Sequence, residues 1–212
     1  MVNGRMAPAE IEKRSFAIIT EELGGCTFAP GVAEVVKRVI HTTADFDYAD
    51  NLCFSENVIE RAKAALGAGA TIVTDTNMAL SGISKPTLAK LGGQALCLMA
   101  DADVAREAKA RGVTRATVSM EHAAKLDGPL IFAIGNAPTA LIRLHELIEE
   151  GAVQPALVIG VPVGFVNVVE AKELFIGGDT PYIIARGRKG GSNVAAAIVN
   201  ALLYQLVKRE GF

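Results

Sequence analysis

The stretch RVIHTTADFDY, residues 38–48, places an imidazole three residues after a guanidinium. Valines and isoleucines recur at helical spacing before it, so we expect Arg38 and His41 on one face of a helix over residues 30–41. Histidine has the unperturbed pKa nearest neutrality, so it can donate or accept a proton, and arginine can pair with a carboxylate. With Thr42 beside it, this pair could bind an acidic ligand and move a proton on it. The alternative is a hydrogen-bonded structural histidine beside a surface arginine.

Polar and small residues follow several apolar runs that are typical of strands. The candidate ligand contacts after the runs TIVTD, LIFAIG and ALVIGV are Asp75, Thr76, Gly135, Asn136, Ala137 and Gly164. Gly135 and Ala137 would let a ligand approach the backbone closely. Asp75 and Thr76 could instead cap the following helix, because both side chains accept hydrogen bonds from backbone N–H groups. For these two residues, the capping interpretation stays open beside the binding one.

The run RGRKGGS, residues 186–192, combines three cations and three glycines before a long helical pattern. Free backbone N–H groups, a helix N-terminus and positive charge would coincide there, so the run favours a bound anion. The candidate contacts are Arg186, Lys189, Gly190 and Ser192. A solvated basic turn with a glycine hinge is the alternative. The run does not follow the Walker A order, and the chain contains no G-x-G-x-x-G fingerprint for a dinucleotide.

The elements that must position these residues alternate along the chain. Helical patterns are expected over 8–23, 30–41 and 56–67, with Ser55 as the N-cap of the last and an extended piece near 45–54. Five apolar runs then alternate with helical patterns; the runs are 71–75, 95–99, 130–135, 156–161 and 182–187. Such alternation predicts an α/β fold: a single three-layer domain over residues 1–212, with a doubly wound, mostly parallel sheet and helices on both faces. The loops after the strands should then gather at one edge, where ligands of such sheets bind.

Composition excludes several classes of protein and site. The net charge is −2, the basic residues are scattered and tryptophan is absent, so nothing indicates a nucleic-acid partner. No apolar run approaches the roughly 20 residues that span a bilayer, and the first ten residues lack a signal-peptide pattern, so we expect a cytoplasmic protein without a membrane partner. The cysteines lie far apart and the histidines are not at ligand spacing, so we expect no protein-held metal.

Five segments together resemble the precorrin-8X methylmutase family, also called precorrin isomerase. They are RVIHTTADFDY, TDTNMALSGI, IGNAPTAL, VIGVPVGFVNVVEAKE and RGRKGGS, in the order of that family and within a similarity that spans about residues 8–205. The resemblance implies an α/β homodimer with its active sites at or near the subunit contact. It also implies an isomerase of cobalamin biosynthesis. The enzyme would move the methyl group at C-11 of precorrin-8X to C-12, giving hydrogenobyrinate, or cobyrinate where cobalt was inserted early.

The resemblance also assigns roles to residues. His41 matches the catalytic histidine, which donates or accepts a proton, and Ser15 and Arg38 match positions that contact the substrate. A methyl shift around a conjugated ring needs the ring to be polarised, which a proton can do, so no cofactor is expected and any cobalt would belong to the substrate. The quoted segments fit metal-free and cobalt-bound substrates equally. The alternatives are a corrinoid carrier without turnover, and an unrelated α/β enzyme that binds phosphate at RGRKGGS.

Overall fold

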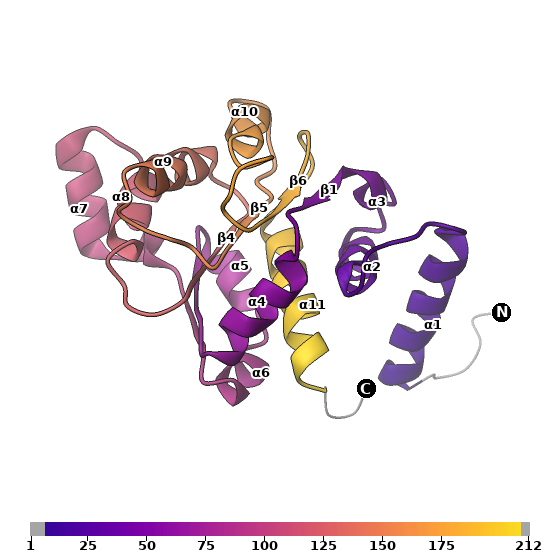
Figure 1. Ribbon diagram of the computed structural model, residues 1–212. Coiled ribbons are helices and arrows are strands. Elements are labelled where there is room, and N and C mark those ends of the chain that lie inside the picture. The colour runs from indigo at the N-terminus through magenta and orange to yellow at the C-terminus, as the bar shows by residue number, and fades with distance from the viewer. Residues whose placement is uncertain (1–6, 209–212) are drawn as a thin grey trace.

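The computed structural model describes residues 7–208, which form a six-stranded sheet covered by helices (Figure 1). The strand order is β1-β6-β5-β4-β2-β3. The strands are β1 (Leu52–Phe54), β2 (Thr71–Thr74), β3 (Gln94–Leu96), β4 (Leu130–Ile134), β5 (Leu157–Gly160) and β6 (Tyr182–Ala185). All neighbouring pairs are parallel except β1 with β6. The predicted mostly parallel α/β sheet is therefore confirmed, with one additional antiparallel edge strand.

Helices cover both faces of this sheet. The helices within residues 7–208 are α1 (Pro8–Glu22), α2 (Val32–Thr43), α3 (Tyr48–Asn51), α4 (Val58–Gly67), α5 (Asn77–Gly82), α6 (Lys85–Lys90), α7 (Ala102–Arg111), α8 (Arg115–Ala123), α9 (Pro138–Glu149), α10 (Val168–Glu173) and α11 (Ser192–Leu206), with a 3-10 turn over Leu98–Ala100. Alternate residues of β4 serve the two faces: Ile131 and Ala133 join a core with α2, α4 and α11, whereas Phe132 and Ile134 join a core with α8 and α9. Figure 1 shows α4 and α11 below the strands and α9 and α10 above them.

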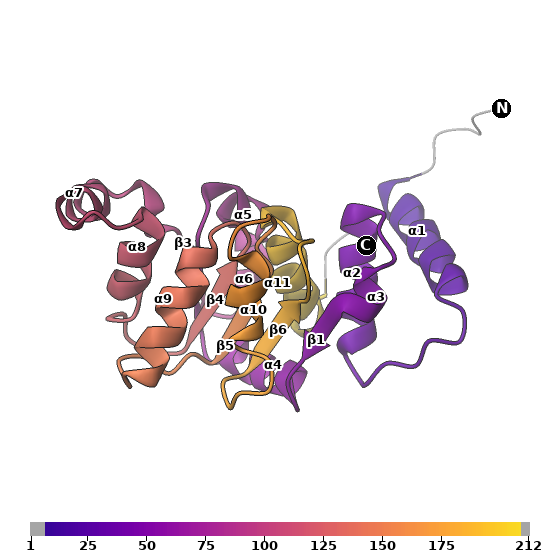
Figure 2. The same cartoon turned by 90° about the horizontal axis from the view of Figure 1, so that it is seen from above.

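Helices α1 and α2 form one end of the molecule. The apolar face of α2 is buried, and α2 packs against α11. Helix α1 packs against α2 and lies on its far side from the strands (Figure 2). The α2 helix runs past its expected end to Thr43 and stops at Ala44, whose left-handed conformation (φ 55°) lets its N–H donate to the Ile40 carbonyl. His41 therefore lies in the last turn of α2.

Two local predictions are wrong. Ser55 is not a helix N-cap, because α4 begins after Asn57, and the Ser55 hydroxyl instead accepts a hydrogen bond from the Tyr182 N–H at 2.9 Å. The stretch 45–54 is extended only at its end, since residues 48–51 form the short helix α3. In both places, pairing of β1 with β6 decides the backbone conformation. No helix within residues 7–208 is both long enough and apolar enough to cross a membrane.

Candidate active site

Phe16 of α1 contacts both Arg38 and His41 of α2. The Phe16 and His41 rings stack with their centroids 5.1 Å apart and their planes 8° from parallel. The Arg38 guanidinium carbon lies 4.7 Å from the Phe16 ring centroid and 5.3 Å from that of Tyr204 on α11. Arg38 thus lies against one aromatic ring from α1 and another from α11. These rings stabilise its positive charge and restrict the orientation of its guanidinium group. We call Phe16, Arg38 and His41 the His41 cluster.

Glu12 is the carboxylate partner of Arg38. Its Oε1 lies 2.5 Å from Arg38 Nη1, and the two side chains are only 16% and 19% exposed. Glu12 and Phe16 are four residues apart on α1, so both meet α2 from one helix face. Sequence reasoning missed Glu12, Phe16 and Tyr204. The four-residue spacing of Glu12 and Phe16 could have shown that they share a helix face, whereas no sequence pattern connects Tyr204 with Arg38.

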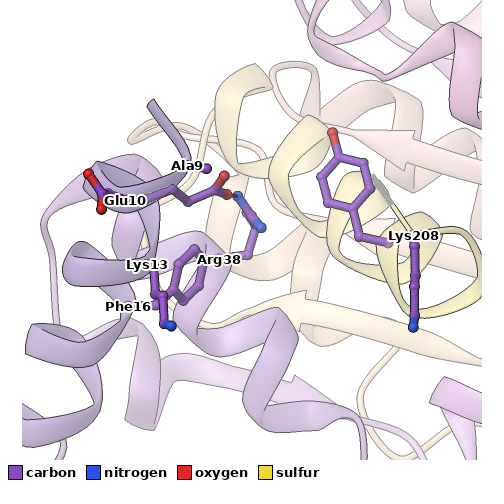
Figure 3. Close-up of a pocket in the computed structure, with 8 residues that line it drawn as sticks. Ala9, Glu10, Lys13, Phe16, Arg38 and Lys208 are labelled. Atoms are coloured by element: carbon purple, nitrogen blue, oxygen red, sulfur yellow. Dashed lines mark hydrogen bonds and ion pairs between the residues drawn. The ribbon is translucent and has the colours of Figure 1, made fainter. Parts of the chain in front are cut away.

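A cavity of about 700 Å³ opens between α1, α2 and the end of α11. Its lining residues are Ala9, Glu10, Glu12, Lys13, Phe16, Arg38, Tyr204 and Lys208. Figure 3 shows Arg38 and Phe16 on one side, with Lys208 across from them. The volume lies in the range of small-molecule sites. The lining combines two aromatic rings with three cationic and two acidic side chains, so one positive charge is in excess, which suits a flat, partly apolar ligand with acidic groups.

Ser15 and Thr42 lie near this cluster, but their hydroxyl protons are used within their own helices. Ser15 Oγ donates to the Ile11 carbonyl and Thr42 Oγ1 donates to the Arg38 carbonyl, both at 2.9 Å. Such bonds to the preceding turn are common for hydroxyl side chains in helices. Either oxygen can still accept a hydrogen bond, so the substrate contacts expected for Ser15 and Thr42 stay predictions.

Asp75, at the end of β2, is buried and holds the loop that precedes α9. Its carboxylate is 1% exposed and accepts the N–H groups of Gly135, Asn136 and Ala137 at 2.9, 2.8 and 2.6 Å. Burial raises the pKa of Asp75, and these three donors oppose the rise. The backbone N–H groups of this loop, which we expected a ligand to approach closely, are therefore already bonded to Asp75, and contact of Gly135, Asn136 or Ala137 with a substrate stays a prediction.

Thr76 caps α5, and its hydroxyl joins two loops. Its Oγ1 accepts the Ala79 N–H at 3.1 Å and lies 2.7 Å from Ser192 Oγ at the start of α11. Of the two alternatives for Thr76, the capping interaction is present. A glycine is also needed at position 135 for the end of β4 to lie close to the start of α11, because a Cβ there would lie 2.7 Å from Ser192 Cα. These residues join β2, β4 and α11 at the carboxyl edge of the sheet.

Two of the three cations of RGRKGGS form ion pairs within the protein. Arg186 pairs with Glu173 at 2.9 Å, and Lys189 Nζ lies 2.6 Å from both Asp45 and Asp47. These two carboxylates raise the pKa of Lys189. The pairing reduces the positive charge that we expected to seat an anion. It also brings the run beside the segment that follows His41.

The glycines of this run serve close backbone contacts. A Cβ at Gly190 would lie 2.0 Å from the Val161 carbonyl oxygen, and the Gly191 N–H donates to that oxygen at 2.8 Å. The Gly164 N–H donates to the Arg188 carbonyl at 3.2 Å. The structure therefore brings the RGRKGGS and VPVGFVN loops together, and contact of Gly164 or Gly190 with a substrate stays a prediction.

The remaining histidines lie away from the cluster. His122 Nε2 is 2.8 Å from a Glu107 oxygen, and the His145 ring meets Phe175 edge-on with centroids 5.6 Å apart. All three cysteines are free. Across residues 7–208, no three His, Cys, Asp or Glu side chains lie together in a group that could hold a metal ion.

A family model, curated relatives and a solved structure all show similarity of this chain to one family of proteins. Residues 10–205 match the family model described as precorrin-8X methylmutase. A cobalt-precorrin-8 methylmutase of Salmonella typhimurium is 47% identical over 207 residues, which cover 94% of this chain and 96% of the relative. A precorrin-8X methylmutase of Pseudomonas aeruginosa is 40% identical over 195 residues, covering 91% and 93%. The crystal structure of a Thermus thermophilus precorrin-8X methylmutase superposes with a TM-score of 0.84 at 41% identity, covering 92% of this chain and 94% of that one.

Proposed function

The chain belongs to the precorrin-8X methylmutase family, and we propose that it is an isomerase acting on precorrin-8X or its cobalt-bound counterpart. The reaction would move the methyl group at C-11 to C-12 in cobalamin biosynthesis. The observation that carries this proposal is the His41 cluster, whose members Phe16 and Arg38 line the cavity and whose His41 ring stacks on Phe16, within a family match that covers nearly the whole chain. The cluster supplies a proton-transfer group, a carboxylate-binding group and an aromatic surface in one place.

In the proposed mechanism, His41 places a proton on the conjugated ring system and later takes it back. The proton draws electron density from the ring, so the bond from the methyl group to C-11 can break as the bond to C-12 forms. Substrate and product then contain the same atoms, and no oxidant or reductant is needed. Histidine suits this role because its unperturbed pKa allows both directions of proton transfer near neutral pH.

Arg38 would bind one carboxylate of the substrate while Phe16 and Tyr204 keep its guanidinium in place. Arg38 has five N–H donors, so it can hold Glu12 and still offer donors to a second carboxylate. Ser15 and Thr42 would contribute hydroxyl oxygens from the two flanking helices. Lys13 and Lys208, which also line the cavity, would attract the remaining acidic groups of the macrocycle.

The remaining parts of the proposal concern the whole protein. We propose a single domain, no resident cofactor and a cytoplasmic location, with any cobalt carried by the substrate. We also propose a homodimer, because the loop after β5 exposes Val163, Phe165 and Val166, with Phe165 81% exposed. The oligomeric state is measured by light scattering across a range of protein concentrations.

The activity is tested by absorption spectroscopy of metal-free and cobalt-bound precorrin-8X in parallel. Wild-type protein should convert one or both pigments to the rearranged chromophore. His41→Ala should bind the pigment but slow its conversion by roughly 10²–10⁴-fold, the usual contribution of a general acid–base group. His145→Ala, which removes an imidazole from α9, is the matched control and should retain turnover. Wild-type protein that binds both pigments and rearranges neither would instead be a carrier.

A further inference from the structure

Lys172 is a buried cation that the proposed mechanism does not use. It lies on α10, next to the core residue Ala171, and is 0% exposed. Its Nζ donates to the carbonyl oxygens of Gly187 and Lys189, both at 2.8 Å. Burial lowers the pKa of Lys172 to about 8. A methionine of similar length would fill the same space without burying a charge, so the ammonium needs another explanation.

The two carbonyl groups belong to the loop between β6 and α11. Between them, the Arg188 carbonyl accepts the Gly164 N–H at 3.2 Å, so Gly164 and Lys172 together supply the donors for three successive carbonyl groups of this loop. The side chains of this segment reach in other directions. The Arg188 guanidinium carbon lies 5.5 Å from the Phe165 ring centroid, and Lys189 reaches Asp45 and Asp47.

Asp45 and Asp47 follow directly on the end of α2. Ala44 ends that helix, and His41 lies in its last turn. A continuous series of contacts thus leads from Lys172 through the backbone of residues 187–189 and the Lys189 side chain to the segment after His41. Without the ammonium, the half-buried carbonyl groups of Gly187 and Lys189 would lose their shared donor, and the loop would move to reach water.

We propose that Lys172 is a positioning residue, whose buried ammonium holds residues 187–189 so that Lys189, paired with Asp45 and Asp47, fixes the segment that follows the His41 end of α2. The inference rests on the proposed function, because this segment would border the substrate next to His41. Lys172 itself touches no substrate. Its effect is on binding, through the placement of Lys189 and of the segment after α2.

The first test needs no substrate. Hydrogen exchange is measured on the free wild-type protein, Lys172→Met, Lys172→Gln and the control Lys109→Met, whose lysine is exposed on α7. Losing the charge-assisted hydrogen bonds to the Gly187 and Lys189 carbonyls should accelerate exchange of the Gly164 and Gly191 amides, whose own hydrogen bonds join the two loops, by roughly tenfold or more in Lys172→Met. The exchange rates of Lys172→Gln, which keeps a donor, should lie between those of wild type and Lys172→Met. Unchanged exchange of these two amides, or an equal increase throughout the chain, overturns the proposal.

The second test is a double-mutant cycle on substrate binding. Lys172→Met should raise KM for the corrin precursor about tenfold while kcat changes by less than about threefold. If Lys172 acts through the loop, adding Lys189→Met should raise KM by less than about twofold further, although Lys189→Met alone raises it more. Independent, multiplying effects would contradict the proposal. A wild-type protein without turnover would refute the proposed function instead, and the exchange experiment would still decide the role of Lys172.

Discussion

The rings of Phe16 and His41 lie parallel, 8° apart in plane and 5.1 Å apart at their centroids, although Phe16 belongs to α1 and His41 to α2. The His41 imidazole is otherwise exposed at the end of its helix. The stack therefore restricts the direction in which the ring nitrogens point. Since the same phenyl ring also lies against Arg38, one side chain of α1 orients both groups to which the proposed mechanism assigns a role.

Replacing Phe16 should reduce catalysis through the orientation of His41. Phe16→Leu keeps an apolar side chain but loses the stack, which is worth about 0.5–1.5 kcal/mol, so kcat should fall by roughly two- to tenfold. Phe16→Tyr keeps the ring and should stay close to wild type. The measurement is the initial rate of chromophore conversion. A Phe16→Leu enzyme as fast as wild type would show that the stack does not orient His41.

Arg38→Lys should weaken substrate binding even though the charge is kept. An ammonium can neither pair with a carboxylate through two parallel bonds nor lie flat between Phe16 and Tyr204. We expect KM to rise by about tenfold or more, with a smaller change in kcat. Arg106→Lys, on the exposed face of α7, is the matched control and should change neither constant. An equal loss of kcat with KM unchanged would assign Arg38 to the chemical step.

Asp75→Asn should destabilise the protein without touching the cavity. An amide offers one acceptor oxygen to three N–H groups and turns its own N–H donors toward them. The free energy of unfolding should therefore fall by about 1–3 kcal/mol in urea denaturation. Asp103→Asn on the surface of α7 should stay within about 0.5 kcal/mol of wild type. Equal stabilities for the two variants would mean that Asp75 does not hold the loop before α9.

The pH dependence of stability should report on Lys172. Its pKa of about 8 lies below the 10.5 of an ordinary lysine. Between these values the unfolded chain binds more protons at this position than the folded chain does, so this group makes stability rise with pH, by up to about 3 kcal/mol. The difference in unfolding free energy between wild type and Lys172→Met should therefore move in favour of wild type across that interval. A constant difference would show that burial does not lower this pKa.

Much of the fold could be predicted from local pattern. The apolar runs that became β2, β4, β5 and β6 are buried along their whole length, as parallel strands covered on both faces must be. The expected sharing of one helix face by Arg38 and His41 agrees with the structure because it needs only helical periodicity. Ser55 was assigned wrongly because its local signal, a serine before a helical pattern, competes with a hydrogen bond to the distant strand β6.

The sequence alone determined the α/β class, the order of elements and the candidate groups, because the burial preference of each segment is carried by its own residues. Only the tertiary structure decided how those groups are partnered. Phe16 meets His41, Asp75 holds residues 135–137, and Lys172 holds residues 187–189. Each contact joins residues on different elements, so it depends on the sheet order and on how α1 and α2 pack at its end. Periodicity describes one element at a time and contains no information about which other element will lie against it.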